Sequence, residues 1–197
     1  TLFRSPGAFA RDPQLVYRFY NKRRAKLRDV TVAPNPAHRA LAELERGWPG
    51  GFLLVTQNVD DLHERAGSRS LVHLHGELMR GLCRACGTSS PWEDDMDAAS
   101  VCPRCAAPGR MRPDIVWFGE MPYCMDEVYA ALERCAIFVA VGTSGVVYPA
   151  AGFVEAARGA RTIELNLEPS AVSSAFAERR QGAAAELVPA LVRELLP

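Results

Sequence analysis

Two CxxC pairs are the feature that most constrains how this chain folds. Cys83 and Cys86 form the first pair, Cys102 and Cys105 form the second, and residues 87–101 separate them. Each CxxC turn aims two sulfur atoms at one point, and this spacing is typical of a zinc ribbon. Four thiolates complete the tetrahedral coordination of zinc, so no position is left for water or substrate. We therefore predict a structural zinc site; two disulfides or four unconnected thiols are the alternatives.

Composition narrows the compartment and the classes of partner. The chain has 197 residues, with 23 basic residues balanced by 23 acidic ones. This balance predicts neither nucleic acid nor an anionic membrane as a partner, and no apolar run is long enough to span a bilayer. Four of six cysteines in metal spacing favour a reducing cytosol, with Cys124 and Cys135 as ordinary semi-buried thiols. No secretory signal pattern opens the chain, and we expect a cytoplasmic monomer.

The hydrophobic pattern predicts an α/β fold. Apolar runs rich in branched residues predict buried strands at residues 52–56, 115–118, 137–141 and 162–165. Helical patterns cover residues 36–46, 126–135, 149–158 and 185–196, and the basic segment 1–32 also reads as helical. Strands that alternate with helices of this length indicate a Rossmann-like parallel sheet with helices on both faces.

Polar residues follow three of the predicted strands. These residues are Gln57, Asn58 and Asp60 after the first, Gly142, Thr143 and Ser144 after another, and Asn166 and Glu168 after the last. Ligands of parallel α/β sheets bind at the carboxyl ends of the strands. A single group of polar residues after a strand is commonly an ordinary loop, but three such groups at the same sheet edge favour a nucleotide-sized ligand.

Several blocks of sequence occur together in sirtuin order. They are TQNVDDLH at 56–63, HLHGE at 73–77, the two CxxC pairs, VWFGE at 116–120, GTS at 142–144 and NLEP at 166–169. The chain resembles a bacterial sirtuin, an NAD-dependent protein lysine deacylase. The resemblance implies NAD and zinc as cofactors, acyl-lysine proteins as substrates, and nicotinamide and 2'-O-acyl-ADP-ribose as products. It also implies that substrate and cofactor meet in a cleft between a large and a small domain.

The resemblance divides the chain into three parts. Residues 1–33 are the helical segment of the small domain and the acyl pocket. Residues 34–78 and 112–197 form the Rossmann-like NAD-binding domain, and residues 79–111 are a zinc-ribbon insertion.

His75 matches the general base of the family, and Asn58 matches a second catalytic position. His75 lies beside Gly76 at a strand end, and a neutral imidazole can accept a proton near neutral pH. In the reaction that the resemblance implies, the base takes a proton from the ribose of the cofactor. A structural histidine is the alternative, and it fits His73 better, because only His75 abuts the turn.

The resemblance also assigns binding roles. Amides and a carboxylate suit a carboxamide and a ribose, and a glycine lets the backbone approach a ligand closely. The positions implied to bind the cofactor are Gln57, Asn58, Asp60, Gly142, Thr143, Ser144, Asn166, Glu168 and Ala184. The positions implied to pair with the substrate peptide as an added strand are Val116, Phe118, Gly119 and Glu120.

Tyr20 and Arg23 predict which acyl group is removed. Residues three apart share a helix face, and a guanidinium with a phenol can bind a carboxylate. The pair resembles the Tyr-x-x-Arg of class III sirtuins, which accept succinyl- and malonyl-lysine, and we expect acetyl removal as well. A solvated basic helix is the alternative. Arg4 departs from the family, where many relatives have a small residue; it adds a second cation or narrows the pocket.

Some family features are absent. The chain lacks an initiator Met, the Gly-Ala-Gly phosphate-binding turn and the Thr-Phe-Arg segment that open sirtuins, so we read it as a fragment of a longer reading frame or a truncated variant. Competing hypotheses are a zinc-ribbon binding module, a catalytically incomplete scaffold and a mono-ADP-ribosyltransferase. Acidic residues in the ribbon argue against the first. Retention of His75, Asn58 and Asp60 argues against the second, and Tyr20 with Arg23 against the third.

Overall fold

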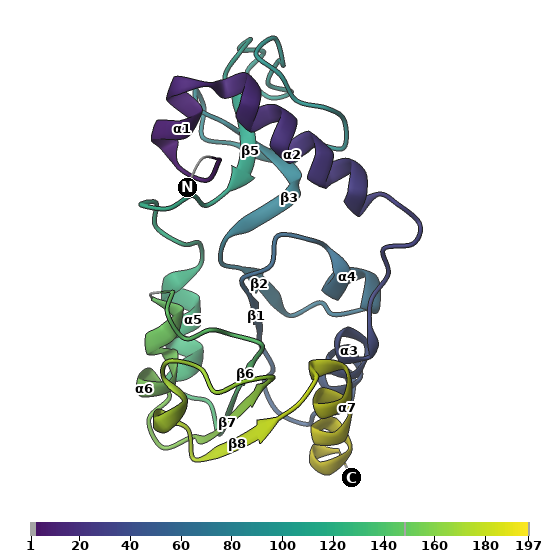
Figure 1. Ribbon diagram of the computed structural model, residues 1–197, viewed down its shortest axis with the longest axis vertical. Helices are drawn as coiled ribbons and strands as arrows, with labels where there is room; N and C mark the ends of the chain where they lie inside the picture. Colours follow the sequence, from purple (N-terminus) through teal and green to yellow (C-terminus); the bar gives the residue numbers. More distant parts are fainter. Residues whose placement is uncertain (1–2, 148, 197) are drawn as a thin grey trace. The chain divides into compact units, whose positions relative to one another are not determined.

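The computed structural model describes residues 3–147 and 149–196, which form two compact units (Figure 1). Unit 1 comprises Thr1–Ala33, Val55–Asp61 and Val72–Tyr123, and unit 2 comprises Pro34–Leu54, Leu62–Leu71 and Cys124–Pro197. The sequence placed residues 55–61, 72–78 and 112–123 with the larger domain, whereas in the structure they pack within unit 1. Residues 76–83 lead into the cysteine-rich segment and residues 111–115 lead out of it. These two stretches pair with one another in a single sheet, which keeps both in unit 1.

Unit 1 begins with two helices instead of one helical segment. Helix α1 spans Pro6–Arg11 and helix α2 spans Pro13–Leu27. The Ser5 hydroxyl accepts a hydrogen bond from the Ala8 N–H at 3.1 Å, and the Asp12 carboxylate accepts one from the Leu15 N–H at 2.9 Å. Side chains of this kind cap helix starts, and proline fits the first helical position because its missing N–H is not needed there. Asp12 and Pro13 therefore end one helix and begin the next.

The sheet of unit 1 is antiparallel. Strand β3 (Gly76–Cys83) lies between β4 (Ser89–Pro91) and β5 (Met111–Ile115). The strand predicted at residues 115–118 was placed too late in the sequence, because β5 ends at Ile115. Beyond it the Phe118 N–H donates to the Arg4 carbonyl at 3.0 Å, and Gly119 turns the chain with a φ of +92°.

Gly76 is required where β3 begins. Its φ is +76°, and a Cβ at this position would lie 2.1 Å from the backbone oxygen of Asp114. Gly76→Ala is expected to destabilise unit 1 by about 3 kcal/mol or more, since left-handed strain of about 1–2 kcal/mol adds to a backbone clash. Gly119→Ala is the matched control, because Gly119 has a similar φ and nothing within 4 Å of the built Cβ. Urea unfolding measures both; equal losses would contradict the role of the clash.

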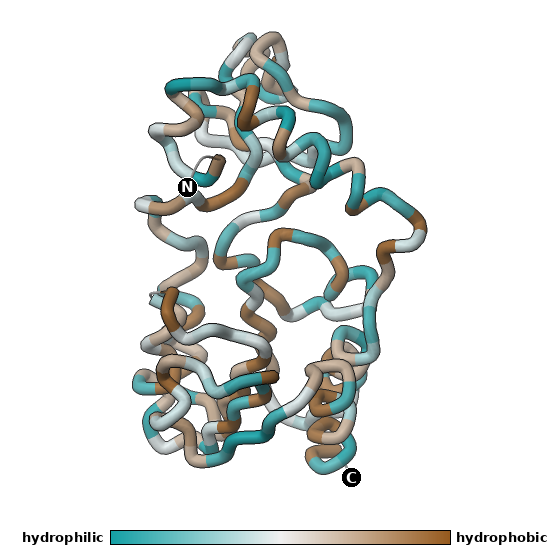
Figure 2. The backbone as a smooth tube through the Cα atoms, in the orientation of Figure 1, coloured by the Kyte–Doolittle hydropathy of each residue, from teal (hydrophilic) through white to brown (hydrophobic). Residues whose placement is uncertain are grey.

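Unit 2 contains the parallel sheet. Its strands β6 (Ile137–Val141), β7 (Arg161–Asn166) and β8 (Glu178–Gln181) pair in that order. The predicted strands at 137–141 and 162–165 are confirmed, and β6 is apolar along its length (Figure 2). Strand β8 was missed because its residues are polar. As an edge strand it carries exposed ion pairs, with Arg161 and Arg180 on Glu178.

Helices cover both faces of this sheet (Figure 1). On one face α3 (Pro36–Gly47) and α7 (Ala184–Leu195) pack with Ile163 and Leu165, and Asn35 caps α3 as expected. On the other side lie α5 (Met125–Leu132), the 3-10 turn η1 (Ala150–Gly152) and α6 (Phe153–Ala156). The helix predicted at 149–158 is thus a 3-10 turn followed by one helical turn, with Gly152 at the junction.

Two short strands complete the α/β fold. Strand β1 (Leu54–Thr56) is shorter than predicted and pairs with β2 (Leu71–His73), and α4 (Leu62–Ala66) lies between them in sequence. The Leu74 N–H donates to the Thr56 carbonyl at 2.9 Å, which extends the pairing into the residues that follow each strand. In the part of the chain that the structure describes, no helix is both long and apolar enough to cross a membrane.

Candidate functional site

The four cysteines of the CxxC pairs converge at one point in unit 1. All four sulfur atoms lie within 4.8 Å of one another. The sulfur atoms of Cys83 and Cys105 are 3.7 Å apart, and those of Cys86 and Cys102 are 3.8 Å apart. A zinc–sulfur bond of about 2.3 Å in tetrahedral geometry gives a sulfur separation of about 3.8 Å, whereas a disulfide needs about 2 Å. The cluster therefore fits a zinc ion and excludes disulfides.

The backbone around the cluster is built for metal-bound thiolates. Ala85 and Arg104 each donate a backbone N–H to the first sulfur of their pair at 3.4 Å. After each pair the chain turns through a left-handed residue, Gly87 with φ 71° and Ala106 with φ 55°. Such N–H···S contacts orient ligands and stabilise negative charge on sulfur. The two halves of the site repeat one another, as expected for a zinc ribbon.

Four crowded thiols cannot all ionise without a cation. Hydrogen bonds from Thr88 lower the pKa of Cys86 to about 6. A hydrogen bond from the Ala107 N–H lowers the pKa of Cys105, but desolvation and the neighbouring thiols outweigh it and raise that pKa to about 12. Opposite shifts are typical of groups that repel one another's charge. A divalent cation removes that repulsion, which again fits zinc.

His75 lies in the turn between β2 and β3. Its Nδ1 is 3.1 Å from the backbone carbonyl oxygen of Gln57, which can only accept a hydrogen bond. Nδ1 therefore carries the proton in the neutral ring, and Nε2 is left with a free lone pair. The half-buried imidazole is thus held in the tautomer that can accept a proton at Nε2. His73 makes the equivalent contact with the carbonyl oxygen of Asn58, at 3.1 Å.

The loop after β1 is fixed by its backbone. The Asn58 N–H donates to the Thr56 hydroxyl at 3.1 Å, and the Val59 carbonyl accepts the Leu78 N–H at 2.7 Å. Gln57 and Asp60 are half-buried, and the Asn58 side chain is exposed. The structure therefore brings this loop together with the turn that carries His75, through β3 and through the Gln57 carbonyl.

Tyr20 is buried, with 2% of its surface exposed, and its hydroxyl has a defined partner. The indole N–H of Trp117 donates to the Tyr20 oxygen at 2.9 Å. Burial raises the pKa of Tyr20, although the hydrogen bond from Trp117 and the charges of Arg23, Arg4 and Arg112 oppose the shift. The phenol thus keeps its proton at neutral pH. Since an indole is only a donor, that proton is not used by Trp117.

Arg112 holds Trp117 in place. The Arg112 guanidinium carbon lies 3.6 Å from the centre of the Trp117 ring, and its nitrogens pair with both Glu120 oxygens at 2.6 and 2.8 Å. Burial raises the pKa of Glu120, but hydrogen bonds from Arg112 and from the Trp117 N–H outweigh it and hold that pKa below the usual value. Glu120 is therefore an ionised partner for Arg112 within the protein.

The basic run on α2 has two kinds of arginine. Arg24 is fully buried and donates to the Leu78 carbonyl at 3.1 Å and to the Asn21 side chain at 2.9 Å, so it ties α2 to the sheet. Arg23 is exposed, and its guanidinium carbon lies 5.7 Å from the centre of the Phe19 ring. Of these two arginines, Arg23 is therefore the one that presents its charge to solvent beside Tyr20.

The segment predicted to bind peptide is a turn whose N–H groups are mostly engaged. The Val116 N–H donates to the His75 carbonyl at 2.9 Å, and the Glu120 N–H to the Trp117 carbonyl at 2.9 Å. Phe118 and Gly119 are exposed. The contact of Val116 with His75 places this segment directly against the turn that carries the imidazole.

In unit 2 three strand ends meet at one edge of the sheet, because β6, β7 and β8 are parallel. Gly142 adopts a φ of +62° and donates its N–H to the Leu165 carbonyl at 2.9 Å. The Asn166 side-chain amide donates to the Thr143 carbonyl at 2.6 Å. The exposed Ser144 accepts a hydrogen bond from the Ala171 N–H at its carbonyl, at 3.0 Å. These contacts join the loops after β6 and β7 into one surface.

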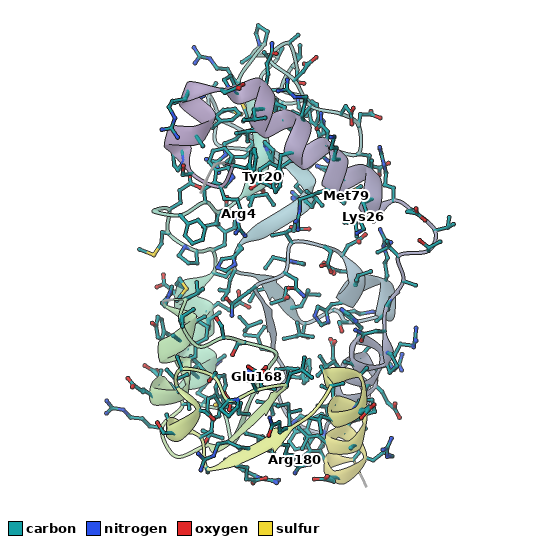
Figure 3. All side chains as sticks on the ribbon, viewed as in Figure 1. Arg4, Tyr20, Lys26, Met79, Glu168 and Arg180 are labelled. Carbon is teal, nitrogen blue, oxygen red and sulfur yellow. The ribbon has the colours of Figure 1, made fainter. Side chains whose placement is uncertain are left out.

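The third loop of this edge follows β8. The Gly182 N–H donates to the Asn166 carbonyl at 2.9 Å, and Ala184 begins α7. Glu168, labelled in Figure 3, is exposed after β7. Hydroxyls, an amide, a carboxylate and a close-approach glycine therefore share the carboxyl edge of the sheet, and this donor set suits a nucleotide.

Sequence reasoning missed Trp117 and Arg112. A signal for Trp117 was available, since a buried indole N–H needs an acceptor and Trp117 lies inside the VWFGE block. Nothing in the sequence indicated that Arg112 pairs with Glu120. The two free cysteines outside the cluster also differ from one another, because Cys135 is half-buried while Cys124 is exposed.

Fold and site together define an α/β nucleotide-binding protein with a four-cysteine metal site. A model of the Sir2 family matches residues 2–149. A protein of Bdellovibrio bacteriovorus described as an NAD-dependent protein deacylase is 54% identical over 192 residues, which is 98% of this chain and 82% of that protein. A Vibrio cholerae protein of the same description is 53% identical over 194 residues, with 98% and 79% covered. The chain belongs to the Sir2 family.

A solved structure agrees with this assignment. A mutant Sir2 homologue in complex with ADP-ribose superimposes with a TM-score of 0.89 and 38% sequence identity, covering 98% of this chain and 78% of that one.

Proposed function

We propose that this protein is an NAD-dependent protein lysine deacylase that removes succinyl, malonyl and acetyl groups. The observation that carries the reaction type is the His75 turn, where a backbone carbonyl fixes the imidazole tautomer beside the Gln57–Asp60 loop. The names of the relatives, which are NAD-dependent deacylases, support the same cofactor and reaction here.

Different residues of the chain accept the proton and bind the cofactor. NAD, when bound, supplies the ADP-ribosyl group that receives the acyl group, with nicotinamide as the leaving group. His75 accepts a proton at Nε2 and holds its own N–H on the Gln57 carbonyl, so the ring does not have to reorient. Gln57, Asn58 and Asp60 hold the nicotinamide end.

At the carboxyl edge of the unit 2 sheet, the loops after β6, β7 and β8 offer groups that suit the phosphates and the adenosine of NAD. Gly142, Thr143 and Ser144 would bind the phosphates and ribose, and the amide of Asn166, bonded to the Thr143 carbonyl, keeps this loop in place. Glu168 would accept hydrogen bonds from the adenosine ribose, and the backbone at Ala184 would be the position for the adenine.

A zinc ion would have a structural role here, with Cys83, Cys86, Cys102 and Cys105 as its four ligands. The substrate peptide lies along residues 116–120. Because the N–H groups of Val116, Phe118 and Glu120 are already engaged, the peptide pairs with the carbonyl groups of this segment and with Gly119. Main-chain pairing reads little side-chain sequence, so many proteins can be substrates.

The choice of acyl group rests on Tyr20. Trp117 occupies one side of the Tyr20 oxygen, so the phenolic proton is directed to another acceptor. A carboxylate at the end of a succinyl or malonyl group is such an acceptor, and the exposed Arg23 supplies a charge-assisted bond to it. Acetyl-lysine lacks the carboxylate and depends on neither group.

A competition assay tests the proposed function. The purified protein is mixed with NAD and equal amounts of one peptide carrying succinyl-lysine or acetyl-lysine, and both are followed by mass spectrometry. We expect NAD-dependent loss of both acyl groups, with succinyl favoured. Loss of acetyl alone would contradict the proposed acyl preference, and loss of neither would contradict the deacylase function.

Arg23→Met is expected to reduce desuccinylation about 30-fold, the equivalent of about 2 kcal/mol for a charge-assisted pair, while deacetylation stays within about twofold. Lys22→Met is the matched control, because Lys22 is an exposed cation on the same helix. Steady-state kcat/KM with both peptides measures the effect. An equal loss with both peptides would mean that Arg23 is structural.

A further inference from the structure

Residue 4 is held in a defined position beside Tyr20. The Arg4 carbonyl accepts the Phe118 N–H at 3.0 Å, and the next residue, Ser5, caps α1. On the other side, Phe3 stacks on Phe19 with ring centres 4.8 Å apart. Contacts on both sides of residue 4 therefore fix where its side chain starts.

The Arg4 guanidinium is exposed, and its carbon lies 5.5 Å from the centre of the Phe118 ring. Within residues 3–147 and 149–196, neither Arg4 nor Arg23 forms an ion pair, whereas Arg112 is paired with Glu120. Of the arginines that act on Tyr20, these two are left with uncompensated charge.

Arg4 and Arg23 both act electrostatically on the hydroxyl of Tyr20. Arg4 and Arg23 each lower the pKa of Tyr20 against the effect of burial, so both guanidinium groups lie within electrostatic range of it. Figure 3 labels Arg4 and Tyr20 close to one another, in agreement with the electrostatic effect of Arg4 on Tyr20. Arg4 stacks on the Phe118 side and Arg23 on the Phe19 side. Two like charges beside one hydroxyl repel, and an anion bound between them relieves that repulsion.

We propose that Arg4 is a second carboxylate-binding cation, which with Arg23 and Tyr20 selects lysine acyl groups that end in a carboxylate. This inference rests on the proposed function. It makes residue 4 a determinant of specificity, because a small residue there would leave the acyl carboxylate a single guanidinium. The proposal also implies that the Arg4 guanidinium stays stacked on Phe118 while its positive charge attracts the acyl carboxylate.

The test uses four peptides and three variants. The peptides carry succinyl- or acetyl-lysine, each with neutral or with acidic neighbouring residues. The variants are Arg4→Ala, Arg4→Lys and, as matched control, Arg18→Ala, which removes an exposed arginine of α2. Steady-state kcat/KM with saturating NAD is measured for every combination.

Arg4→Ala is expected to lower kcat/KM for both succinyl peptides roughly fivefold, as for an exposed ion pair, and to leave both acetyl peptides within about twofold. Arg4→Lys should show a smaller loss of kcat/KM for the succinyl peptides than Arg4→Ala. Lysine keeps the positive charge but lacks the planar guanidinium that binds a carboxylate through two hydrogen bonds. Arg18→Ala should not change the ratio of succinyl to acetyl turnover.

Other results would overturn the inference. If Arg4→Ala lowers kcat/KM only for the peptides with acidic neighbouring residues, whichever acyl group they carry, then Arg4 binds the peptide and not the acyl carboxylate. An equal loss with all four peptides would mean that Arg4 only supports the fold. If Arg4→Ala changes nothing while Arg23→Met selectively lowers desuccinylation, the inference fails and the proposed function stands. If the unsubstituted protein does not remove succinyl groups, both fail.

Discussion

Replacing His75 with asparagine is expected to lower kcat/KM for deacylation by about 100- to 10,000-fold, the range that general bases contribute. The asparagine amide can still donate to the Gln57 carbonyl, which now receives Nδ1–H at 3.1 Å. What it lacks is a nitrogen lone pair that accepts a proton. The variant therefore separates the positioning of the side chain from its basicity, and the circular dichroism spectrum and unfolding midpoint should remain those of the parent protein.

His73→Asn is the matched comparison. His73 makes the same contact to a backbone carbonyl, that of Asn58, but it lies within β2 and not in the turn. We expect a loss of less than about tenfold, because no proton transfer is assigned to it. If His73→Asn costs as much as His75→Asn, or if His75→Asn retains substantial turnover, the base is not His75.

Cys102→Ser is expected to abolish stoichiometric zinc binding and to unfold the cysteine-rich segment. Cys102 is buried, and its sulfur lies 3.8 Å from that of Cys86, so a shorter and less acidic serine hydroxyl cannot replace it. Structural zinc binding is worth roughly 10 kcal/mol or more and is coupled to folding. Metal analysis should fall from one zinc per chain to nearly none, and deacylation should be lost as an indirect result.

Cys124→Ser provides the control, since Cys124 is exposed and outside the cluster. It should retain one zinc per chain and full activity. Treating the parent protein with a strong chelator should reproduce the Cys102→Ser result. A chelated protein that remains folded and active would contradict a structural role for the metal.

Spacing and composition identified much of this protein from the sequence. The zinc ligands were predictable because four cysteines in two CxxC turns have few other uses. The strands at 137–141 and 162–165 were predictable because buried parallel strands are continuous apolar runs. Strand β8 was not predictable, because all four of its residues are polar and no apolar residue marks it as a strand; they are Glu178, Arg179, Arg180 and Gln181. The end of β5 at Ile115 was also missed, since Val116–Phe118 is apolar yet its N–H groups bond outside a strand ladder.

By itself the sequence determined the residue types of the site: the cysteines, the imidazole at a strand end, and the Tyr20–Arg23 spacing on a helix. Only the tertiary structure decided what those residues can do, because hydrogen-bond partners come from distant parts of the chain. The Gln57 carbonyl sets the His75 tautomer, and the Trp117 indole leaves the Tyr20 proton free. The same holds for charge: Arg24 is buried and bonded to carbonyl groups, and Arg112 is neutralised by Glu120. Among the residues that the structure describes, the uncompensated cations beside Tyr20 are therefore Arg4 and Arg23.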